Sequence, residues 1–224
     1  MELLQSALDF FLHLDQYLYT MIVDYGPWIY LILFLIIFVE TGLVIMPFLP
    51  GDSLLFAAGT FCAGVVGANG DVASINLWLV LILLSIAAIA GDTVNYLIGK
   101  NLGLKVLNWK IAGKQLVKQQ YIDQTHEFFE KHGPKTIIIA RFVPIVRTFA
   151  PFVAGIGSMN YGTFIRYNVI GGLVWVWGLT LVGYFFGNLP FVQNNFETVI
   201  FGIIGLSLLP MVFEIVKAKL SKKD

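Results

Sequence analysis

Six apolar segments dominate this sequence and limit what it can fold into. A helix needs about 20 mostly apolar residues to cross the hydrocarbon core of a bilayer. Of the 224 residues, 58% are hydrophobic and only 12% are charged, and the mean hydropathy is +0.80. These values are typical of an integral membrane protein and exclude an ordinary soluble domain. The segments, all expected to be helical, are residues 28–46, 50–66, 77–99, 136–156, 167–187 and about 197–214.

Prolines interrupt two regions of the apolar sequence. The first two segments meet at Pro47-Phe48-Leu49-Pro50, and the fourth contains Pro144 and Pro151. Proline removes a backbone donor and disfavours a continuous helix. We therefore expect each region to form a re-entrant hairpin of two short limbs. Residues 28–46 are also long enough to cross fully, which would move the N-terminus to the other side of the membrane.

Several short patterns occur in the same order in both halves of the chain. They predict two copies of one unit, each with an interfacial amphipathic helix, a re-entrant hairpin and one full crossing. One crossing per copy inverts the second copy relative to the first, an architecture that transporters use. The first-half patterns are Asp15-Gln16, Tyr25-Gly26-Pro27, Pro47, Ala58-Gly59 and Tyr96-x-x-Gly99; their counterparts are Asp123-Gln124, His132-Gly133-Pro134, Pro144, Ala154-Gly155 and Tyr184-x-x-Gly187.

The predicted fold is therefore an all-α polytopic membrane protein with one membrane domain, residues 1–224. Residues 1–99 form the first repeat, residues 100–190 the inverted second repeat, and residues 191–224 a C-terminal transmembrane helix with a basic tail. Residues 1–99 contain no lysine or arginine, whereas seven lysines lie between positions 100 and 135 and four between positions 217 and 223. By the positive-inside rule the lysine-rich loop and the C-terminus are cytoplasmic. The acidic N-terminal stretch is better placed outside.

Four charged residues inside the two hairpins are the main candidates for a functional site. Glu40 and Asp52 flank the first break, and Arg141 and Arg147 flank Pro144. A charge at the centre of a membrane helix costs about 2.5 to 3.5 kcal/mol on insertion scales, so such residues usually have a function. If the hairpins face each other, two acids meet two guanidiniums, and the planar guanidinium suits both carboxylate and phosphate. We expect Arg141 and Arg147 to bind a phosphate, and a proton on Glu40 or Asp52 to loosen the pairing.

Other interpretations of the buried charges remain open. The same four residues could form static ion pairs that hold the hairpins together without any ligand. Asp92 is a third acid in an apolar run, and we include it among the proton-coupling candidates. A hydrogen bond to Asn95 or extension of its side chain to the interface would explain it equally well. The sequence has no Ser-His-Asp order, phosphate-binding glycine loop or zinc-ligand spacing, which predicts no enzyme activity, cofactor or metal.

The residues around these charges resemble the DedA family of bacterial inner-membrane proteins, within the VTT/SNARE-associated superfamily. The resemblance implies two opposed re-entrant hairpins, a fold shared with eukaryotic lipid scramblases. It also implies a role in lipid homeostasis and envelope integrity, and an association both with the return of undecaprenyl phosphate across the inner membrane and with dependence on the proton motive force. The acids and arginines required in the family fall on Glu40, Asp52, Arg141 and Arg147. The matching segments are Phe38-Val39-Glu40-Thr41-Gly42, Pro47 to Leu55, Gly91-Asp92-x-x-Asn95-Tyr96-x-x-Gly99, Lys131-His132-Gly133, Ala140-Arg141-Phe142-Val143-Pro144-x-x-Arg147-Thr148 and Ala154-Gly155.

The sequence therefore predicts a multi-pass inner-membrane lipid translocase that moves undecaprenyl phosphate or a phospholipid with proton coupling. Its expected partners are a lipid phosphate headgroup, protons and the bilayer, with a homo-oligomer possible and no nucleic acid. Two other functions remain open. One is a proton-coupled antiporter for small cations, in which the carboxylates bind the cation. The other is an assembly factor that transports nothing.

Overall fold

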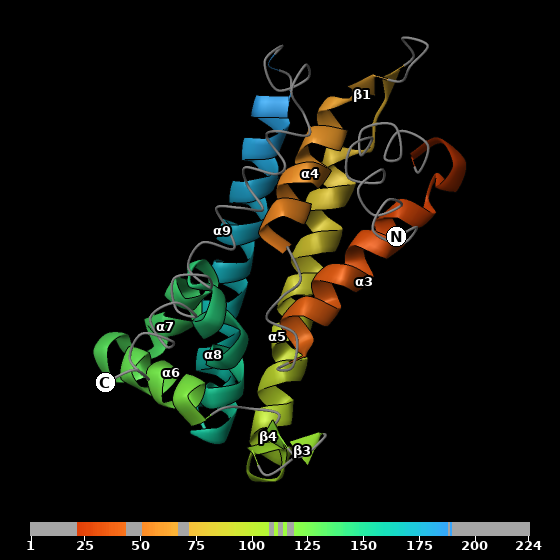
Figure 1. Cartoon of the computed structure of the whole chain (residues 1–224). Coiled ribbons are helices and arrows are strands. Elements are labelled where there is room, and N and C mark those ends of the chain that lie inside the picture. Colours follow the sequence, from red (N-terminus) through yellow and green to blue (C-terminus); the bar gives the residue numbers. More distant parts are fainter. Residues whose placement is uncertain are drawn as a thin grey trace, which may run out of the picture. The chain divides into compact units, whose positions relative to one another are not determined.

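The computed structural model describes residues 22–43, 51–66, 72–107, 110–111, 114–115, 119–187 and 189. This part of the chain is mainly helical, as predicted (Figure 1). The predicted N-terminal interfacial helix, the Pro47–Pro50 break, the sixth apolar segment and the basic tail lie outside the described residues. The α-helices are Trp28–Gly42 (α3), Gly51–Ala63 (α4), Leu77–Leu107 (α5), Gln119–His132 (α6), Thr136–Ile139 (α7), Pro144–Ile156 (α8) and Tyr161–Gly187 (α9), with 3₁₀ turns at Gly133–Lys135 (η1) and Ala140–Phe142 (η2).

Two very short antiparallel ladders add strands that the sequence did not predict. Val65–Val66 (β1) pairs with Val72–Ala73 (β2), with Val65 opposite Ala73. Lys110–Ile111 (β3) pairs with Lys114–Gln115 (β4) in the same way. Each strand has two residues, too few for an alternating pattern to register in the sequence. They are local chain reversals after α4 and α5 and leave the helical architecture unchanged.

The two longest helices are α5, with 31 residues, and α9, with 27. Among the described residues, only these two helices are long and apolar enough to cross a membrane. The candidate spans are Leu77–Gly103 within α5 and Tyr161–Gly187, which is the whole of α9. Both helices extend beyond the apolar segments at 77–99 and 167–187. The early start of α9 has a local cause, because Asn160 Oδ1 accepts hydrogen bonds from the backbone N–H groups of Gly162 and Thr163. Such a side-chain cap accepts hydrogen bonds from backbone N–H groups of the first turn, which have no acceptor within the helix.

The helices around the predicted hairpins are short. α3 has 15 residues and α4 and α8 have 13 each. At about 1.5 Å per residue they span roughly 20 to 22 Å, less than the hydrocarbon core of about 30 Å. None of these three helices is long enough to cross the core alone.

The second hairpin region breaks at one proline and not at two. Val143 is extended, with φ −118° and ψ 105°, and α8 begins at Pro144. Proline is well suited to this first helical position, where its missing N–H is not needed. The prediction was wrong for Pro151, because α8 continues through it. In the turn before Pro151, Asn95 on α5 donates a hydrogen bond to the backbone oxygen of Thr148. Pro151 lacks the N–H that would reach the carbonyl of Arg147, four residues earlier, so the bond from Asn95 lies beside that position and does not replace the missing donor. Internal prolines are nevertheless tolerated in membrane helices that pack against neighbours.

The described helices belong to two compact units. The first unit draws its residues from the ranges Met1–Leu33, Pro50–Leu83 and Trp177–Asp224, and the second from Phe34–Leu49 and Leu84–Val176. Each unit therefore contains residues from both of the predicted sequence repeats.

Glycines bring two helices into close contact inside each unit. In the first unit, a Cβ on Gly59 of α4 would lie 2.0 Å from the backbone oxygen of Thr180 on α9. In the second unit, a Cβ on Gly155 of α8 would lie 2.2 Å from the backbone oxygen of Tyr96 on α5. Gly183 on α9 and Gly99 on α5 make the reciprocal approaches, to Phe56 and Phe152. Such contacts are typical of helix packing in membranes, where small residues let backbones approach.

Gly99→Ala is therefore expected to destabilise the second unit. Its Cβ would lie 2.2 Å from the backbone oxygen of Phe152, so α5 and α8 must move apart. Overpacking of this kind typically costs about 1 to 3 kcal/mol, which thermal unfolding in detergent would measure. Gly178→Ala is the matched control, because Gly178 lies inside α9 and a Cβ added there would meet no atom within 4 Å. Equal melting temperatures for the two variants would contradict the expected close contact.

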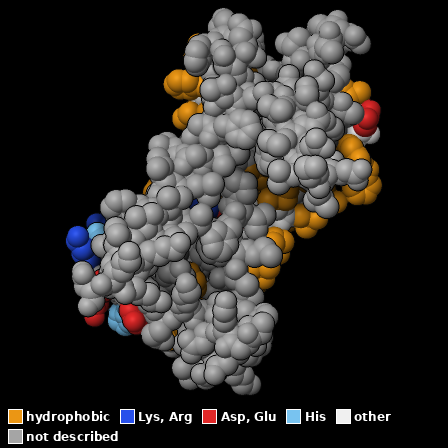
Figure 2. Space-filling model, viewed as in Figure 1, with side chains coloured by type: hydrophobic (Ala, Val, Ile, Leu, Met, Phe, Trp, Pro, Cys, Tyr) orange, Lys and Arg blue, Asp and Glu red, His pale blue; other side chains and the backbone are white. Residues whose placement is uncertain are grey.

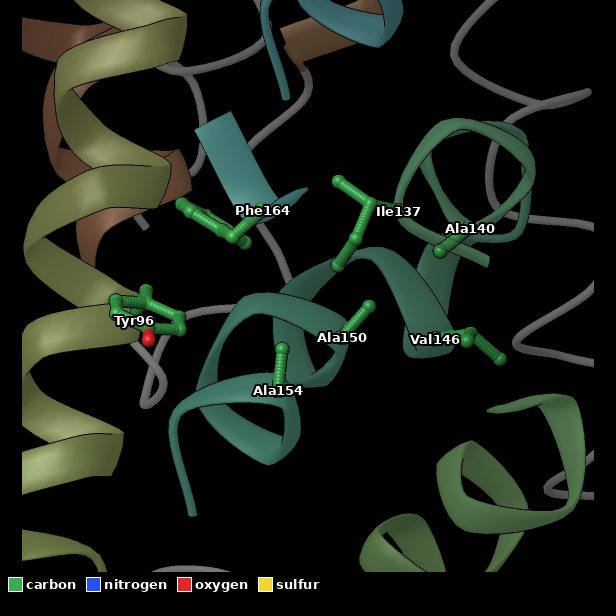
Figure 3. Packing of buried hydrophobic residues seen from close by; sticks show 7 residues of the cluster. All are labelled: Tyr96, Ile137, Ala140, Val146, Ala150, Ala154 and Phe164. Carbon is green, nitrogen blue, oxygen red and sulfur yellow. The ribbon is translucent and has the colours of Figure 1, made fainter. Parts of the chain in front are cut away.

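The second unit has its own apolar core (Figure 3). Tyr96 stacks on Phe164 with ring centroids 4.4 Å apart, and its hydroxyl donates a hydrogen bond to the backbone oxygen of Met159. The amphipathic helix α6 packs on α8, with Ile122 among Phe149, Phe152 and Val153. Figure 2 shows charged and histidine side chains gathered over the outer face of α6. The remaining members of the core in Figure 3 are Ile137, Ala140, Val146, Ala150 and Ala154.

Candidate functional site

Two buried ion pairs lie inside the second unit. Arg147 Nη2 is 2.6 Å from Glu40 Oε1, and Arg141 Nη2 is 2.6 Å from Asp92 Oδ2. Their side chains are only 4 to 14% exposed. Removal of four charges from water is costly, and each pair offsets part of that cost by attraction and hydrogen bonding. The arrangement is the most concentrated group of buried charge in the described part of the chain.

Local backbone features place each of these side chains. Arg141 lies in η2, just before the break at Val143, and Arg147 lies in the first turn of α8, just after it. Glu40 lies near the end of α3. Gly91 on α5 allows α3 to come close, since a Cβ there would lie 2.8 Å from the backbone oxygen of Phe38. The next residue along α5 is Asp92, so this contact brings both acids to the same region.

One face of α9 is built around Arg141. Asn168 Oδ1 accepts a hydrogen bond from Arg141 Nη2 at 2.7 Å, and Asn168 Nδ2 donates to the backbone oxygen of Ile89 on α5. One turn further, Gly171 and Gly172 leave room for the guanidinium: a Cβ on either would lie 3.3 to 3.4 Å from its nitrogens. Asn168, Gly171 and Gly172 share a helix face because they are three or four residues apart. Arg141 is therefore held from three sides, by α5, α9 and its own turn.

Trp175 lies on the same face of α9, one turn beyond Gly171. Its ring centroid is 5.5 Å from Arg141 Cζ and 5.7 Å from Arg147 Cζ. Both distances fall within the range of a cation–π interaction, about 6 Å. Trp175 is 2% exposed. One indole thus contacts both guanidiniums of the site.

Asn95 connects three helices beside the ion pairs. Its Nδ2 donates to the backbone oxygens of Thr41, at the end of α3, and Thr148, in α8. The amide has two N–H groups, and these two bonds use both. Asn95 therefore cannot donate to Asp92, the bond suggested by the sequence, and Asp92 bonds to Arg141 instead. The three helices α3, α5 and α8 are held together at the level of the charges.

A small cavity lies between the two ion pairs. The centre of a water-sized sphere can move within a volume of about 10 Å³ inside this cavity. That is at the lower limit for a single water molecule. A phosphate group is much larger, so it can reach the guanidiniums only if the surrounding side chains or helices move. The lining residues are Glu40, Thr41, Asp92, Arg141, Arg147, Thr148 and Trp175.

Four of the five predicted site residues lie in the second unit, and the fifth lies in the first. Glu40, Asp92, Arg141 and Arg147 line one cavity, and the contact of Glu40 with Arg147 agrees with the expected pairing of the two hairpin regions. Arg141 pairs with Asp92 and not with a hairpin acid. Asp52 lies in the first turn of α4, in the first unit, and its part in the site stays a prediction. Sequence reasoning missed Asn168 and Trp175, although their spacing with Gly171 and Gly172 along one helix face was a usable signal.

The described residues contain no cluster of side chains typical of a metal site. No group of three or more His, Cys, Asp or Glu side chains within them is placed to hold a metal ion. His126 and Glu130 are 3.9 Å apart on the outer face of α6, with side chains that are 67% and 73% exposed. A solvated pair on an amphipathic helix explains them.

Comparison with known proteins identifies the family. The model of the VTT domain matches residues 49–185. The chain is 52% identical to Protein DedA of Escherichia coli K12 over 219 residues, covering 98% of this chain and 96% of that protein. It is 43% identical to the uncharacterized membrane protein ML0287 of Mycobacterium leprae, covering 78% of this chain and 74% of that protein. It is also 38% identical to the inner membrane protein YqjA of Escherichia coli K12, covering 82% and 78%.

No solved structure matches the chain. The family match spans α4, α5, α8 and most of α9, and the match to Protein DedA also includes the segment that carries Glu40. Relatives at this level of identity are named as membrane proteins, in agreement with the two long apolar helices. The chain is a membrane protein of the DedA family, built on the VTT domain.

Proposed function

We propose that this protein moves a lipid phosphate headgroup across the bacterial inner membrane with proton coupling. Undecaprenyl phosphate or a phospholipid is the proposed substrate, with its hydrocarbon tails left in the bilayer. The observation that carries the proposal is the cavity in which two guanidiniums face two carboxylates, with Arg147 the most exposed of the four side chains at 14%. Phosphate and carboxylate offer guanidinium the same bidentate geometry, so one can replace the other.

The two arginines have different roles in the proposal. Arg141 is bound by Asp92 and Asn168 and is 5% exposed, so it acts as the fixed half of the phosphate site. Arg147 is the more exposed of the two, at 14%, and exchanges Glu40 for phosphate. A proton on Glu40 removes the negative charge that competes for Arg147. Proton uptake and phosphate binding are thereby coupled, with Asp52 and Asp92 as further candidates for proton transfer.

The proposal includes two opposed re-entrant hairpins in an inverted repeat, with the lysine-rich loop and the C-terminus in the cytoplasm. Paired local features support it. Gly26 and Gly133 both precede a proline, and both have positive φ, +44° and +57°. Gly59 and Gly155, which correspond in the predicted repeat, make the same close helix contact in their separate units. The shortness of α3, α4 and α8 also suits limbs that turn back inside the bilayer.

The direct test is lipid flipping by purified protein in proteoliposomes. Fluorescent phospholipid or labelled undecaprenyl phosphate would be placed in one leaflet, and its appearance in the other measured with an impermeant reagent. We expect flipping that accelerates with an imposed proton gradient. Glu40→Gln mimics the protonated acid, so its flipping should respond much less to the gradient. A wild-type protein that flips neither lipid would overturn the proposal.

Proton-coupled cation antiport is the second candidate, favoured by the presence of two carboxylates in one cavity. In that function Glu40 and Asp92 would bind the cation and the arginines would act as counter-ions. Cation-driven proton flux in the same vesicles, without lipid flipping, would select it. Neither flux, together with co-purification of a stable partner, would favour an assembly factor.

A further inference from the structure

We infer that Trp175 is a positioning residue that holds the guanidinium of Arg147 beside that of Arg141 while Arg147 changes its anionic partner. The inference rests on the proposed function, because it concerns the exchange of carboxylate for phosphate at that site. Trp175 carries no charge, and neither the family patterns nor the paired acids and arginines point to it.

The geometry places Trp175 where an exchange needs support. Its ring lies within 5.7 Å of both guanidinium carbons and lines the cavity together with the two acids. The indole is 2% exposed, so the contact lies out of water. Cation–π attraction is stronger when the cation is desolvated. The neutral ring thus contacts both guanidiniums. A third acid in its place would compete with the substrate phosphate for the two arginines.

The contribution of the ring changes during the exchange. When Arg147 is paired with Glu40 or with phosphate, an anion neutralises it, and the ring contact is present in both states. Between these states the guanidinium has released one anionic partner and has not yet bound the next, which is costly in a low-dielectric cavity. The ring then stays in contact with it, beside the carboxylate of Asp92 in the same cavity. Trp175 should therefore raise the rate of exchange more than the affinity for phosphate.

Fluorinated forms of Trp175 can distinguish electrostatic positioning of Arg147 from ordinary core packing. Stepwise fluorination of the indole withdraws electron density from the ring face and changes its volume very little. A core residue would tolerate such a series without a graded effect. A cation–π partner should lose function progressively with each added fluorine.

The experiment introduces mono-, di- and trifluorotryptophan at position 175 by nonsense suppression in the full-length protein. Lipid flipping is measured in proteoliposomes as a maximal rate and a half-saturating lipid concentration. We expect the maximal rate to fall in steps, to about one-tenth with three fluorines, while the half-saturating concentration changes less than about twofold. Trp175→Phe, which keeps a ring face, should retain more activity than Trp175→Leu.

Trp177 supplies the matched control, since it lies on the same helix and its ring packs against Trp78, with centroids 6.3 Å apart. The same fluorinated series at position 177 should leave the rate unchanged. A flat series at position 175 in a protein that flips lipid would overturn the inference and leave the proposed function standing. A graded loss at both positions would also overturn it, because the effect would not be specific to the arginine contact. If the wild-type protein flips no lipid, both proposals fail.

Discussion

Arg141→Leu is expected to lower the free energy of unfolding by about 3 to 5 kcal/mol, the largest stability effect expected of any single substitution at the site. The substitution leaves the Asp92 carboxylate buried without its guanidinium, because Asp92 lies 2.6 Å from Arg141 and its side chain is 6% exposed. It also removes the donor to Asn168. Thermal or denaturant unfolding in detergent, followed by the circular dichroism of the helices, measures the loss.

The double variant Asp92→Leu with Arg141→Leu tests the cause. Removal of both charges takes away the unpaired carboxylate, and replacement of a buried pair by apolar groups is often neutral. We expect the double variant to recover most of the stability that Arg141→Leu loses. An additive loss in the double variant would show that Arg141 stabilises the fold through packing or through Asn168, and not through Asp92.

The sequence was sufficient to find most of the charged site. Glu40, Arg141 and Arg147 stand out because a charge in an apolar run is costly, and Pro144 marks the break between the two arginines. The break itself follows from local geometry, since proline favours the first position of a helix. These signals are contained in single residues and their neighbours in the chain.

The partners of these residues could not be predicted in the same way. Asp92 and Arg141 are 49 positions apart, and their pairing depends on how α5 packs against η2. Asn168 and Trp175 carry no charge, so they give no desolvation signal in an apolar helix. The predicted break at Pro151 is wrong, since α8 continues through that proline, and packing against neighbouring helices can make an internal proline tolerable. Tertiary contacts decide each of these cases.

The glycine contacts could be predicted from the sequence only in part. Ala58-Gly59 and Ala154-Gly155 align in the sequence as part of a repeat, without a structural reason. The structure supplies one, since both glycines allow a close backbone approach inside their own units. The partner helix could not be foreseen, because Gly155 packs against α5, which belongs to the other predicted repeat. Sequence similarity between halves indicates shared local roles more reliably than it indicates partners.

Arg147→Leu is expected to reduce lipid flipping at least about a hundredfold in proteoliposomes. Hydrogen bonds to a charged group contribute about 1.5 to 3 kcal/mol each in a protein, and a bidentate guanidinium makes two of them to phosphate. Arg147→Lys keeps the charge but loses the planar pair of donors. We expect it to flip lipid at about one-tenth of the wild-type rate or less, with little change in the amount of folded protein.

A double variant of Glu40 and Arg147 can show whether these two residues form a binding site or a static ion pair. Glu40→Leu with Arg147→Leu removes both charges, so it should fold almost as well as the wild type. If Glu40 and Arg147 only hold α3 against α8, this double variant should also flip lipid normally. If Arg147 binds the phosphate, flipping should stay as low as in Arg147→Leu, because removing the competing acid cannot replace the missing guanidinium. Restored flipping in a well-folded double variant would therefore exclude Arg147 from the transport step.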